Sequence, residues 1–324
     1  MNITVIGFGN IAHGLIALFG NEHDVNILTS KTINSKNIIA HSKNNVIRGK
    51  IKIIANEAKE VIPKSDIIIF TVPAFAREAW IKKISQYIQD GQIIGSLPGA
   101  SGFDEQLSRY THKNITIFSA QRVPFIARII ENGKSVNIDL KNNMSVAFSN
   151  NSKETKELLE QIFKIEINEL DSFLEVNLSN SNPILHTARL YELTRISMYF
   201  NKEIYFYKEW NNETSKILLS MDSEFMKIVR KLKLNIKSLL EHYEVKNAEE
   251  MTKKISSIES FKKIKVPLLK NEGKYRIDTS SRYFTEDVLY GLKYILDYAK
   301  HMDINTPTID KVYIHLKKLM EAND

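Results

Sequence analysis

A single histidine lies inside an apolar helical pattern just past the middle of the chain, in the stretch "NPILHTARLYE". His186 follows Asn182 and Pro183, a pair typical of a helix start, because Asn is a good N-cap and Pro fits the first helical position. The alternative is a longer helix from Asp171 that is kinked at Pro183. The positive end of a helix beside His186 would favour an anion there. His186 is therefore a candidate acid–base residue, although a lone histidine in a helix is more often a packed core residue.

A second polar group of residues lies near the C-terminal end, in "DTSSRYFTEDVLYGL". Arg282 precedes Asp287 by five residues, and Glu286 is next to Asp287. An Asp, Ser or Thr in this stretch could cap a helix that starts near Thr285, and acidic residues in its first turn would match the helix dipole. From the residues alone, the pattern indicates a helix start.

The N-terminus combines a short β-branched strand with a glycine-rich turn, "GFGNIAHG". This is G-x-G-x-x-A, in which Gly7 permits the tight turn, Gly9 lets the backbone approach a pyrophosphate and Ala12 lets the helix pack close to the strand. Phosphates bind the free N–H groups at the start of such a helix. The residues expected to line the dinucleotide here are Gly7, Gly9, Asn10, Ile11 and Ala12.

The second strand, "DVNILTS", indicates which nicotinamide cofactor is used. NAD-selective folds place an Asp or Glu near the end of this strand to bind the ribose 2′-hydroxyl. Here the positions hold Thr29, Ser30 and Lys31, whose hydroxyl groups and ammonium suit a 2′-phosphate. The sequence therefore favours NADP(H) over NAD(H).

Further strands follow at the spacing of an α/β fold: "DIIIFTVPA", "GQIIGSLPGASG", "NITIFSAQRVPF", "MSVAFSN" and "KIEINEL". The continuous apolar runs are typical of parallel strands buried on both faces. Two turns at carboxyl ends of strands contain proline or small residues, which suits a ligand crevice. Val72, Pro73, Pro98 and Gly99 are therefore also expected to contact the cofactor. We predict that residues 1–170 form a doubly wound NAD(P)-binding Rossmann domain.

After residue 170 the strand-like runs give way to long segments of helical period, such as "ETSKILLSMDSEFMKIVRKLKLNIKSLLEHY". Residues 171–324 are predicted to form an all-α substrate domain. Its first helix would start with Asp171 or Ser172 as N-cap. Methionine and aromatic residues at helical spacing are expected to belong to the core of this domain.

The composition excludes several classes of function. The chain has 324 residues, a formal net charge of +7 and no cysteine. Its lysines are dispersed, so we do not expect nucleic-acid binding. Without cysteine there is no disulfide, thiolate nucleophile or thiolate metal site, and no metal site is predicted. No apolar run reaches about 18 residues, so we expect no membrane span. The N-terminal strand does not have the pattern of a signal peptide, and we expect a cytoplasmic protein.

Together the motifs resemble the octopine/nopaline (opine) dehydrogenase family, and the resemblance covers nearly the whole chain. It rests on "GFGNIAHG", the turns "VPA" and "LPG", "NPILH" and "SRYFTEDVLYGL", in that order. The resemblance implies a Rossmann domain followed by an all-helical domain. It also implies condensation of an amino acid with a 2-keto acid through an imine, using NAD(P)H.

The resemblance assigns roles to single residues. His186 would be the acid–base group and Asp287 its partner, while Arg282 would bind the carboxylate of the keto acid through its planar fork. Asn182, in the same stretch as His186, is grouped with Arg282 as a substrate-binding residue. The family usually has Pro after E-D-V, where this chain has Leu289.

Two other classes of function share the Rossmann motif. A ketopantoate reductase-like enzyme or a 2-hydroxy-acid dehydrogenase has the same architecture, but the ketopantoate type relies on a helix lysine, and "EVNLSNSNP" supplies asparagines only. A non-catalytic NADP-binding sensor would keep "GFGNIAHG" without needing His186, Arg282 and Asp287 together. A homodimer is compatible with the sequence, which does not specify the amino acid or the keto acid.

Overall fold

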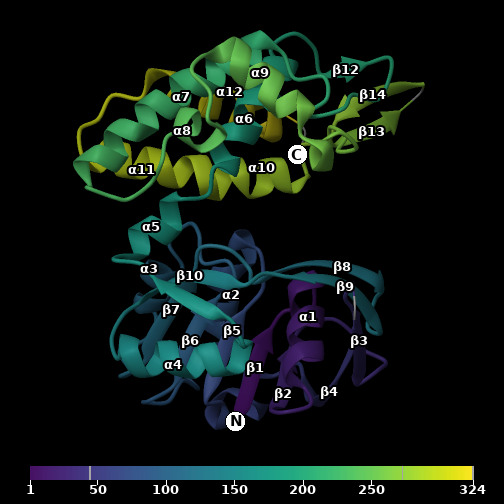
Figure 1. Ribbon diagram of the computed structural model, residues 1–324, viewed down its shortest axis with the longest axis vertical. Helices are drawn as coiled ribbons and strands as arrows, with labels where there is room; N and C mark the ends of the chain where they lie inside the picture. Colours follow the sequence, from purple (N-terminus) through teal and green to yellow (C-terminus); the bar gives the residue numbers. More distant parts are fainter. Residues whose placement is uncertain (44, 272, 323–324) are drawn as a thin grey trace. The chain divides into compact units, whose positions relative to one another are not determined.

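The computed structural model describes residues 1–43, 45–271 and 273–322. The chain divides into two compact units, Met1–Ser179 and Asn180–Asp324 (Figure 1). The short helix α5 (Phe173–Leu178) has Ser172 at its N-cap, as predicted, and belongs to the first unit. The sequence placed the boundary before this helix.

An eleven-stranded sheet forms the first unit, in the order β11-β10-β7-β6-β5-β1-β2-β4-β3-β9-β8. The strands from β7 to β4 are parallel to one another, whereas β10 runs antiparallel to β7. The sequence correctly predicted seven of the strands, which are β1 (Asn2–Ile6), β2 (Asp24–Leu28), β5 (Ile67–Phe70), β6 (Ile93–Ser96), β7 (Thr116–Ala120), β10 (Asn143–Phe148) and β11 (Glu166–Glu169).

Helices cover both faces of this sheet. Alternate residues of β5 point to opposite faces, so Ile67 and Ile69 join one apolar cluster while Ile68 and Phe70 join the other. The first cluster contains residues of α1 and α4, and the second contains residues of α2 and α3. The doubly wound class is thereby confirmed. The helices are α1 (Asn10–Phe19), α2 (Ala74–Ser85), α3 (Phe103–Ser108) and α4 (Ser152–Phe163), with short 3₁₀ turns η1 (Ala58–Glu60) and η2 (Ile62–Lys64).

Two antiparallel hairpins extend the sheet beyond the predicted strands. One consists of β3 (Asn37–His41) and β4 (Val46–Ala55), and the other of β8 (Phe125–Glu131) and β9 (Ser135–Leu140). Strand β4 passes so close to α1 that a Cβ atom on Gly49 would lie 1.9 Å from the carbonyl oxygen of Ile16. The sequence analysis missed these strands because they lack the long apolar run of a buried parallel strand: polar or charged residues interrupt most of them, and β3 has only a short run at residues 38–40.

The second unit is mainly helical, as predicted, and its helix α6 is buried along nearly its whole length against α7, α12 and η4. It also contains a small antiparallel sheet, in the order β12-β14-β13, that the all-α prediction omitted. These strands are only two to four residues long, which is too short for a period-2 pattern. The elements are α6 (Asn182–Thr194), β12 (Tyr199–Phe200), α7 (Asn212–Lys231), α8 (Leu239–Tyr243), α9 (Ala248–Ser257), η3 (Glu259–Phe261), β13 (Leu268–Asn271), β14 (Lys274–Ile277), α10 (Arg282–Thr285), the π-helix η4 (Asp287–Leu292), α11 (Lys293–His301) and α12 (Pro307–Glu321).

Two buried carboxylates of α7 hold the starts of neighbouring helices. Glu224 accepts hydrogen bonds from the N–H groups of Thr308 and Ile309 at 2.9 Å, at the start of α12. Asp222 accepts one from Leu239 N–H at 2.9 Å, at the start of α8. The first N–H groups of a helix have no partner inside it, so these bonds satisfy donors that burial would otherwise leave unpaired.

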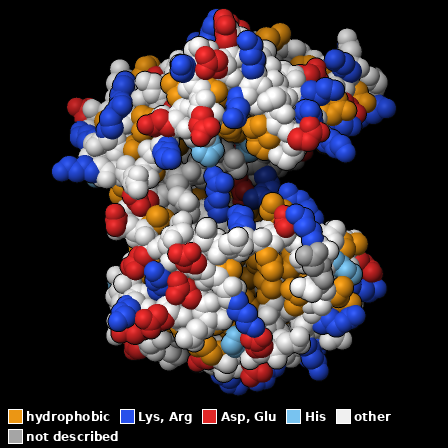
Figure 2. All heavy atoms as spheres, in the orientation of Figure 1, with side chains coloured by type: hydrophobic (Ala, Val, Ile, Leu, Met, Phe, Trp, Pro, Cys, Tyr) orange, Lys and Arg blue, Asp and Glu red, His pale blue; other side chains and the backbone are white. Residues whose placement is uncertain are grey.

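The surface agrees with the dispersed charge of the sequence. On the face drawn in Figure 2, Lys and Arg side chains are interspersed with Asp and Glu on both units. Within the described residues, none of the helices combines the length and the apolar character needed to cross a bilayer.

Asp222 gives a test of the packing around α7. Burial raises the pKa of its carboxyl group from 3.8 to about 6, although the hydrogen bond from Leu239 opposes the rise. Between these two values the folded state binds more protons than the unfolded state, so this group's contribution to stability falls as pH rises through the window. Asp222→Asn keeps an oxygen acceptor and does not ionise. We expect it to stabilise the protein above pH ~7 by about 1–3 kcal/mol.

The measurement is thermal unfolding of both proteins at pH ~4 and pH ~7.5. The gain should be largest at the higher pH and should nearly disappear at the lower. The control is Asp297→Asn, which changes an exposed carboxylate that pairs with Lys293 on α11. An equal gain at both pH values would show that ionisation of Asp222 does not cause the effect.

Candidate active site

His186 bonds to a carboxylate on one side of its ring and to a phenol on the other. Its Nδ1 lies 2.7 Å from Oδ2 of Asp287, and its Nε2 lies 2.8 Å from the hydroxyl of Tyr207. The side chains of His186 and Asp287 are only 10% and 13% exposed. Since an ionised carboxylate only accepts hydrogen bonds, Nδ1 carries the proton in the neutral ring and Nε2 accepts from Tyr207. The pair predicted from the sequence, His186 with Asp287, is thus brought together.

The helix that carries His186 begins where one of the two sequence alternatives placed it. Helix α6 starts at Asn182, and α5 ends at Leu178, so the single kinked helix is wrong. The N-cap is Ser181, not Asn182, and Ser181 has helical backbone angles and makes no capping bond through its side chain. Asn182 is the exposed first residue of α6 and lies four positions before His186, on the same face.

A close contact between the backbone of a glycine and the ring of a proline positions Asp287. Gly291 packs against Pro183, since a Cβ atom on Gly291 would lie 2.3 Å from the Cγ atom of Pro183. Gly291 belongs to η4, in which its N–H bonds to the carbonyl of Glu286, five residues earlier. A π-turn is a wider turn than an α-turn and is frequent at functional sites. The glycine allows η4 to approach the first turn of α6, and Asp287 thereby reaches His186.

Aromatic rings enclose the histidine. Tyr283 contacts the His186 ring edge-on with centroids 4.5 Å apart, and Phe206 does so at 5.5 Å. Phe206 and Tyr283 stack on each other at 4.9 Å. Burial raises the pKa of both Tyr207 and Tyr283, so both phenols keep their protons at neutral pH. The sequence analysis missed Tyr207, because it assigned the aromatic residues of this region to the core and "IYFYKEW" has no motif that separates one tyrosine from the others.

Arg282 lies on α10, just before Asp287 in the chain, but its side chain binds Glu286. Its guanidinium donates to Glu286 from Nε at 2.8 Å, and its side chain is 78% exposed. The helix here starts at Arg282 with Ser281 as N-cap, three residues before the predicted start near Thr285. The structure therefore pairs the exposed Arg282 with Glu286, whose side chain is only 17% exposed.

The glycine-rich turn has the form that a dinucleotide site needs. Gly7 has φ +101°, and a Cβ atom there would lie 2.8 Å from the Cγ1 atom of Val72, so only glycine fits. A Cβ atom on Gly9 would meet nothing within 4 Å. Neither φ nor protein packing therefore requires glycine at position 9, which fits a backbone that a phosphate approaches closely. Ala12 is completely buried, as close packing of helix on strand predicts.

Two side chains of α1 connect this turn to the hairpin of β8 and β9. Asn10 accepts a hydrogen bond from Ile129 N–H at 2.8 Å, so its amide oxygen binds the hairpin. His13 bonds through Nδ1 to the Gly9 carbonyl at 2.8 Å, and its Nε2 accepts from Gly133 N–H at 2.9 Å. Ile11, between them, is half-buried. These bonds hold the Gly9 carbonyl on the protein side, while the N–H of Gly7 donates to the Leu28 carbonyl at 3.0 Å.

The other predicted cofactor residues occupy strand ends of the same sheet. Pro73 is the N-cap of α2, directly after Val72. The buried Arg77 of α2 donates to the carbonyl of Pro98 at 2.9 Å and also to that of Ala100. Gly99 is closely packed, since a Cβ atom there would lie 2.5 Å from the Cβ atom of Ser119. Arg77 thus fixes the shape of the "LPG" turn, and it is a residue that the sequence analysis did not single out.

The end of β2 differs from the prediction in one respect. Thr29 is buried, and its hydroxyl accepts the N–H of Lys31 at 3.2 Å, so this hydroxyl turns inward. Ser30 and Lys31 are exposed. Burial lowers the pKa of His13, and the Lys31 ammonium lowers it further. The positive charge of Lys31 therefore affects a side chain of α1, the helix that starts at the glycine-rich turn.

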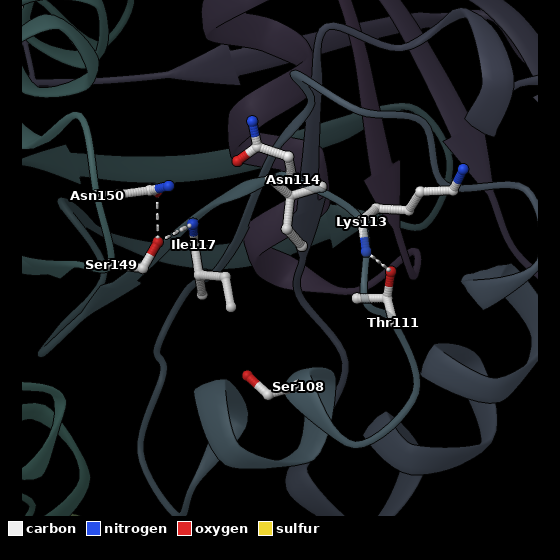
Figure 3. A pocket seen from close by; sticks show the side chains of 8 residues that line it. Ser108, Thr111, Lys113, Asn114, Ile117, Ser149 and Asn150 are labelled. Carbon is white, nitrogen blue, oxygen red and sulfur yellow. Dashed lines mark hydrogen bonds between the residues drawn. The ribbon is translucent and has the colours of Figure 1, made fainter.

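A hollow elsewhere in the first unit does not belong to this site. Figure 3 shows it beside the end of α3, the start of β7 and the residues that follow β10. The Ser149 hydroxyl there accepts from Ile117 N–H and donates to the Asn150 side chain. Asn114 and Ile115, which precede β7, line it. It therefore lies at the amino edge of the parallel strands, opposite the carboxyl edge where dinucleotides bind.

The chain was compared with known families, proteins and solved structures. The family model described as "NAD/NADP octopine/nopaline dehydrogenase, alpha-helical domain" matches residues 169–320. A second model, "NADP oxidoreductase coenzyme F420-dependent", matches residues 2–98. The tauropine dehydrogenase of Arabella iricolor is 23% identical, over 98% of this chain and 91% of that protein. The opine dehydrogenase of Arthrobacter sp. (strain 1C) is 23% identical, over 99% and 91%.

Solved structures show the same fold. Octopine dehydrogenase with NADH and pyruvate superposes with a TM-score of 0.87 at 20% identity, covering 99% of this chain and 89% of that one. Yersinopine dehydrogenase with NADP⁺ bound gives a TM-score of 0.75 at 11% identity, covering 99% and 91%. The family model on the helical unit and the relatives matched along nearly the whole length make this chain similar to the octopine/nopaline (opine) dehydrogenase family.

Proposed function

We propose that this protein is an opine dehydrogenase-type oxidoreductase, which uses a nicotinamide cofactor to condense an amino acid reductively with a 2-keto acid. The observation that carries the proposal is the pair His186 and Asp287, joined at 2.7 Å in the helical unit. The relatives with matching length are named tauropine, octopine and opine dehydrogenases. Octopine dehydrogenase has been solved with NADH together with L-arginine or pyruvate.

The residues supply the proton transfers that this condensation requires. An amine adds to the keto carbon to give a carbinolamine, which loses water to form an imine. His186 takes a proton from the incoming amine and returns one to the departing hydroxyl, because imidazole accepts and donates protons near neutral pH. Asp287 holds the ring as the Nδ1–H tautomer and stabilises the imidazolium. The bound nicotinamide supplies the hydride that reduces the imine carbon.

Arg282 and Asn182 are our proposed substrate-binding residues. A guanidinium can hold a planar carboxylate through two parallel hydrogen bonds. Arg282 is exposed and bonded to Glu286, so a keto-acid carboxylate would take the place of that side chain. Asn182 is exposed on the face of α6 that carries His186, which places its amide within reach of a ligand on that face.

The cofactor is proposed to be NADP(H). Ser30 and Lys31 are exposed at the end of β2, where the 2′-phosphate binds in NADP-selective folds, and neither is a carboxylate. The octopine and yersinopine dehydrogenase structures contain NADH and NADP⁺ respectively, so related folds accept either cofactor. A cytoplasmic location and a homodimer remain predictions from the sequence.

The architecture alone does not separate this proposal from its alternatives, because a ketopantoate reductase also superposes, with a TM-score of 0.67 at 9% identity. The histidine–carboxylate pair favours the opine reaction, and a sensor would not need it. The test is oxidation of NADPH with a series of 2-keto acids, with and without added amino acids, and mass spectrometry of the product. Oxidation that does not depend on the amino acid would indicate a keto-acid reductase. No oxidation with any combination would support a sensor.

The first prediction for this site concerns His186. Loss of a general acid–base group typically slows a reaction by about 10²–10⁴-fold. His186→Gln should therefore lower turnover by at least ~10²-fold while the protein stays folded and binds NADPH. Asp287→Asn should also slow turnover, and the double variant should be much less than additive, because the two residues act as a unit. Turnover and melting temperature are measured on the same samples. A destabilised His186→Gln protein with normal turnover would mean that His186 only packs in the core.

The second prediction concerns the cofactor. NADPH should bind about tenfold more tightly than NADH, a difference on the order of 1.4 kcal/mol, because Lys31 and Ser30 can hold the 2′-phosphate. Lys31→Ala should remove most of this difference by weakening NADPH alone. Direct titration of both cofactors gives the two affinities, with Lys36→Ala, another exposed lysine, as the control. Equal affinities in the unchanged protein would rule out the preference.

The third prediction concerns the contact that brings the pair together. Gly291→Ala places a methyl group against the rigid ring of Pro183 and should push η4 away from α6. A displacement of about 1 Å can cost roughly 10²-fold in rate, so turnover should fall steeply. Overpacking should also destabilise the protein by about 1–3 kcal/mol. Adding Pro183→Gly removes the clashing atoms and should restore part of the turnover. If Gly291→Ala keeps full activity, the contact does not set the geometry of the pair.

A further inference from the structure

His186 has no free ring nitrogen. Asp287 occupies Nδ1 at 2.7 Å, and the Tyr207 hydroxyl occupies Nε2 at 2.8 Å. A neutral imidazole has one donor and one acceptor, and both are used here. In this arrangement the histidine exchanges a proton with a third molecule only through one of its two partners, or after a partner moves. Asp287 does not donate when ionised, which leaves Tyr207 as the route.

Tyr207 is held firmly in its place. It is 4% exposed, and its ring stacks on Phe261 with centroids 4.4 Å apart and lies nearly parallel to Trp210 at 6.1 Å. Trp210 is itself fixed by a bond from Nε1 to the Ser215 hydroxyl at 2.9 Å. Moving the phenol away from Nε2 would break this packing. The ring is therefore held by apolar contacts, while its hydroxyl points at the histidine.

A phenol suits proton transfer in this position because its hydroxyl donates one proton and accepts another at the same time. It does so only while it remains un-ionised. Burial raises the pKa of Tyr207, and the neighbouring Tyr283, Tyr243 and Asp287 raise it further, so the phenol form persists at neutral pH. The hydroxyl thus remains both a donor and an acceptor over the working range of an imidazole.

We propose that the Tyr207 hydroxyl is the third member of the proton path Asp287–His186–Tyr207 and carries the proton between Nε2 of His186 and the reacting substrate. The inference rests on the proposed function, because it describes how His186 serves the condensation. Tyr207 then contacts the reacting oxygen and nitrogen, and Asp287 acts through His186.

The proton balance closes for both steps. When the substrate ammonium loses a proton, that proton goes to the Tyr207 oxygen as the Tyr207 proton moves to Nε2, giving an imidazolium paired with Asp287. When the carbinolamine C–O bond breaks, its electron pair leaves with the oxygen, and the amine lone pair forms the C=N bond. The departing oxygen takes the Tyr207 proton, and the phenol recovers one from Nε2. The products are water and the iminium, and His186 is neutral again.

The test is Tyr207→Phe, which keeps the ring and its stacking and removes only the hydroxyl. We expect turnover to fall by at least ~10²-fold, close to the effect of His186→Gln. The double variant should be little slower than either single variant. NADPH affinity and melting temperature should stay near those of the unchanged protein. Tyr205→Phe is the matched control. Tyr205 lies two positions before Tyr207, and its own ring packs against Lys208. Removing its hydroxyl should leave turnover normal.

Solvent isotope effects give a readout that packing alone would not change. Two protons move together in the relay, so the rate in mixtures of H₂O and D₂O should curve with deuterium fraction in the unchanged protein and become linear in Tyr207→Phe. Fluorotyrosine at position 207 keeps the hydroxyl and the ring packing but makes the phenol a stronger acid, and should change turnover at neutral pH. This second variant decides the question even if Tyr207→Phe is unstable.

The outcomes separate the relay from the proposed function. Normal or faster turnover of Tyr207→Phe, together with an inactive His186→Gln, would overturn the relay alone and show that the phenol gives way to substrate. Normal turnover of both variants would overturn the proposed acid–base role of His186 as well. Unchanged turnover with fluorotyrosine at position 207 would also count against the relay.

Discussion

The hydrogen bond between His186 and Asp287 depends on a glycine backbone that lies closer to a proline ring than any side chain would permit. Gly291 has no Cβ atom, so η4 packs directly on the ring of Pro183 at the start of α6. Pro183 in turn fits the start of a helix because it has no N–H to lose. The wider π-turn then carries Asp287 toward the histidine. The site therefore depends on a small residue and a rigid residue that do no chemistry themselves.

The packing around this pair keeps its members in the states that the proposed proton transfer needs. The aromatic rings exclude water from the histidine, and burial keeps the phenols of Tyr207 and Tyr283 protonated. Removal from water strengthens the bond between the imidazole and the carboxylate, since electrostatic interactions are stronger where water is absent. A polar network of this kind is favourable only when each member has a partner, and Asp287, His186 and Tyr207 satisfy one another.

The sequence predicted the fold class because that class leaves strong local signals. Continuous apolar runs such as that of β5 mark buried parallel strands, and G-x-G-x-x-A at Gly7 marks the phosphate turn. The His186–Asp287 pair came instead from the resemblance to the opine dehydrogenase family, since the residues alone indicated only a helix start. The missed contacts join residues far apart in the chain: His13 binds Gly133 of the β8–β9 hairpin, and Nε2 of His186 binds Tyr207. Neither contact follows a period or a motif, so no local pattern could indicate it.

Arg282 shows that a motif can locate a residue without indicating its binding partner. The motif placed it correctly in sequence beside Asp287, but a motif does not state which group a flexible side chain binds when no substrate is present. A guanidinium four positions before a carboxylate on a helix pairs with it as a matter of course, as Arg282 does with Glu286. Arg282 is 78% exposed, but Glu286 is only 17% exposed, so water reaches one side of this pair more than the other. The pair of His186 and Asp287 differs, because those two side chains are only 10% and 13% exposed. Removing either of them leaves a buried polar group unsatisfied. The guanidinium of Arg282 is thus the accessible member of the first pair, whereas burial fixes both members of the second.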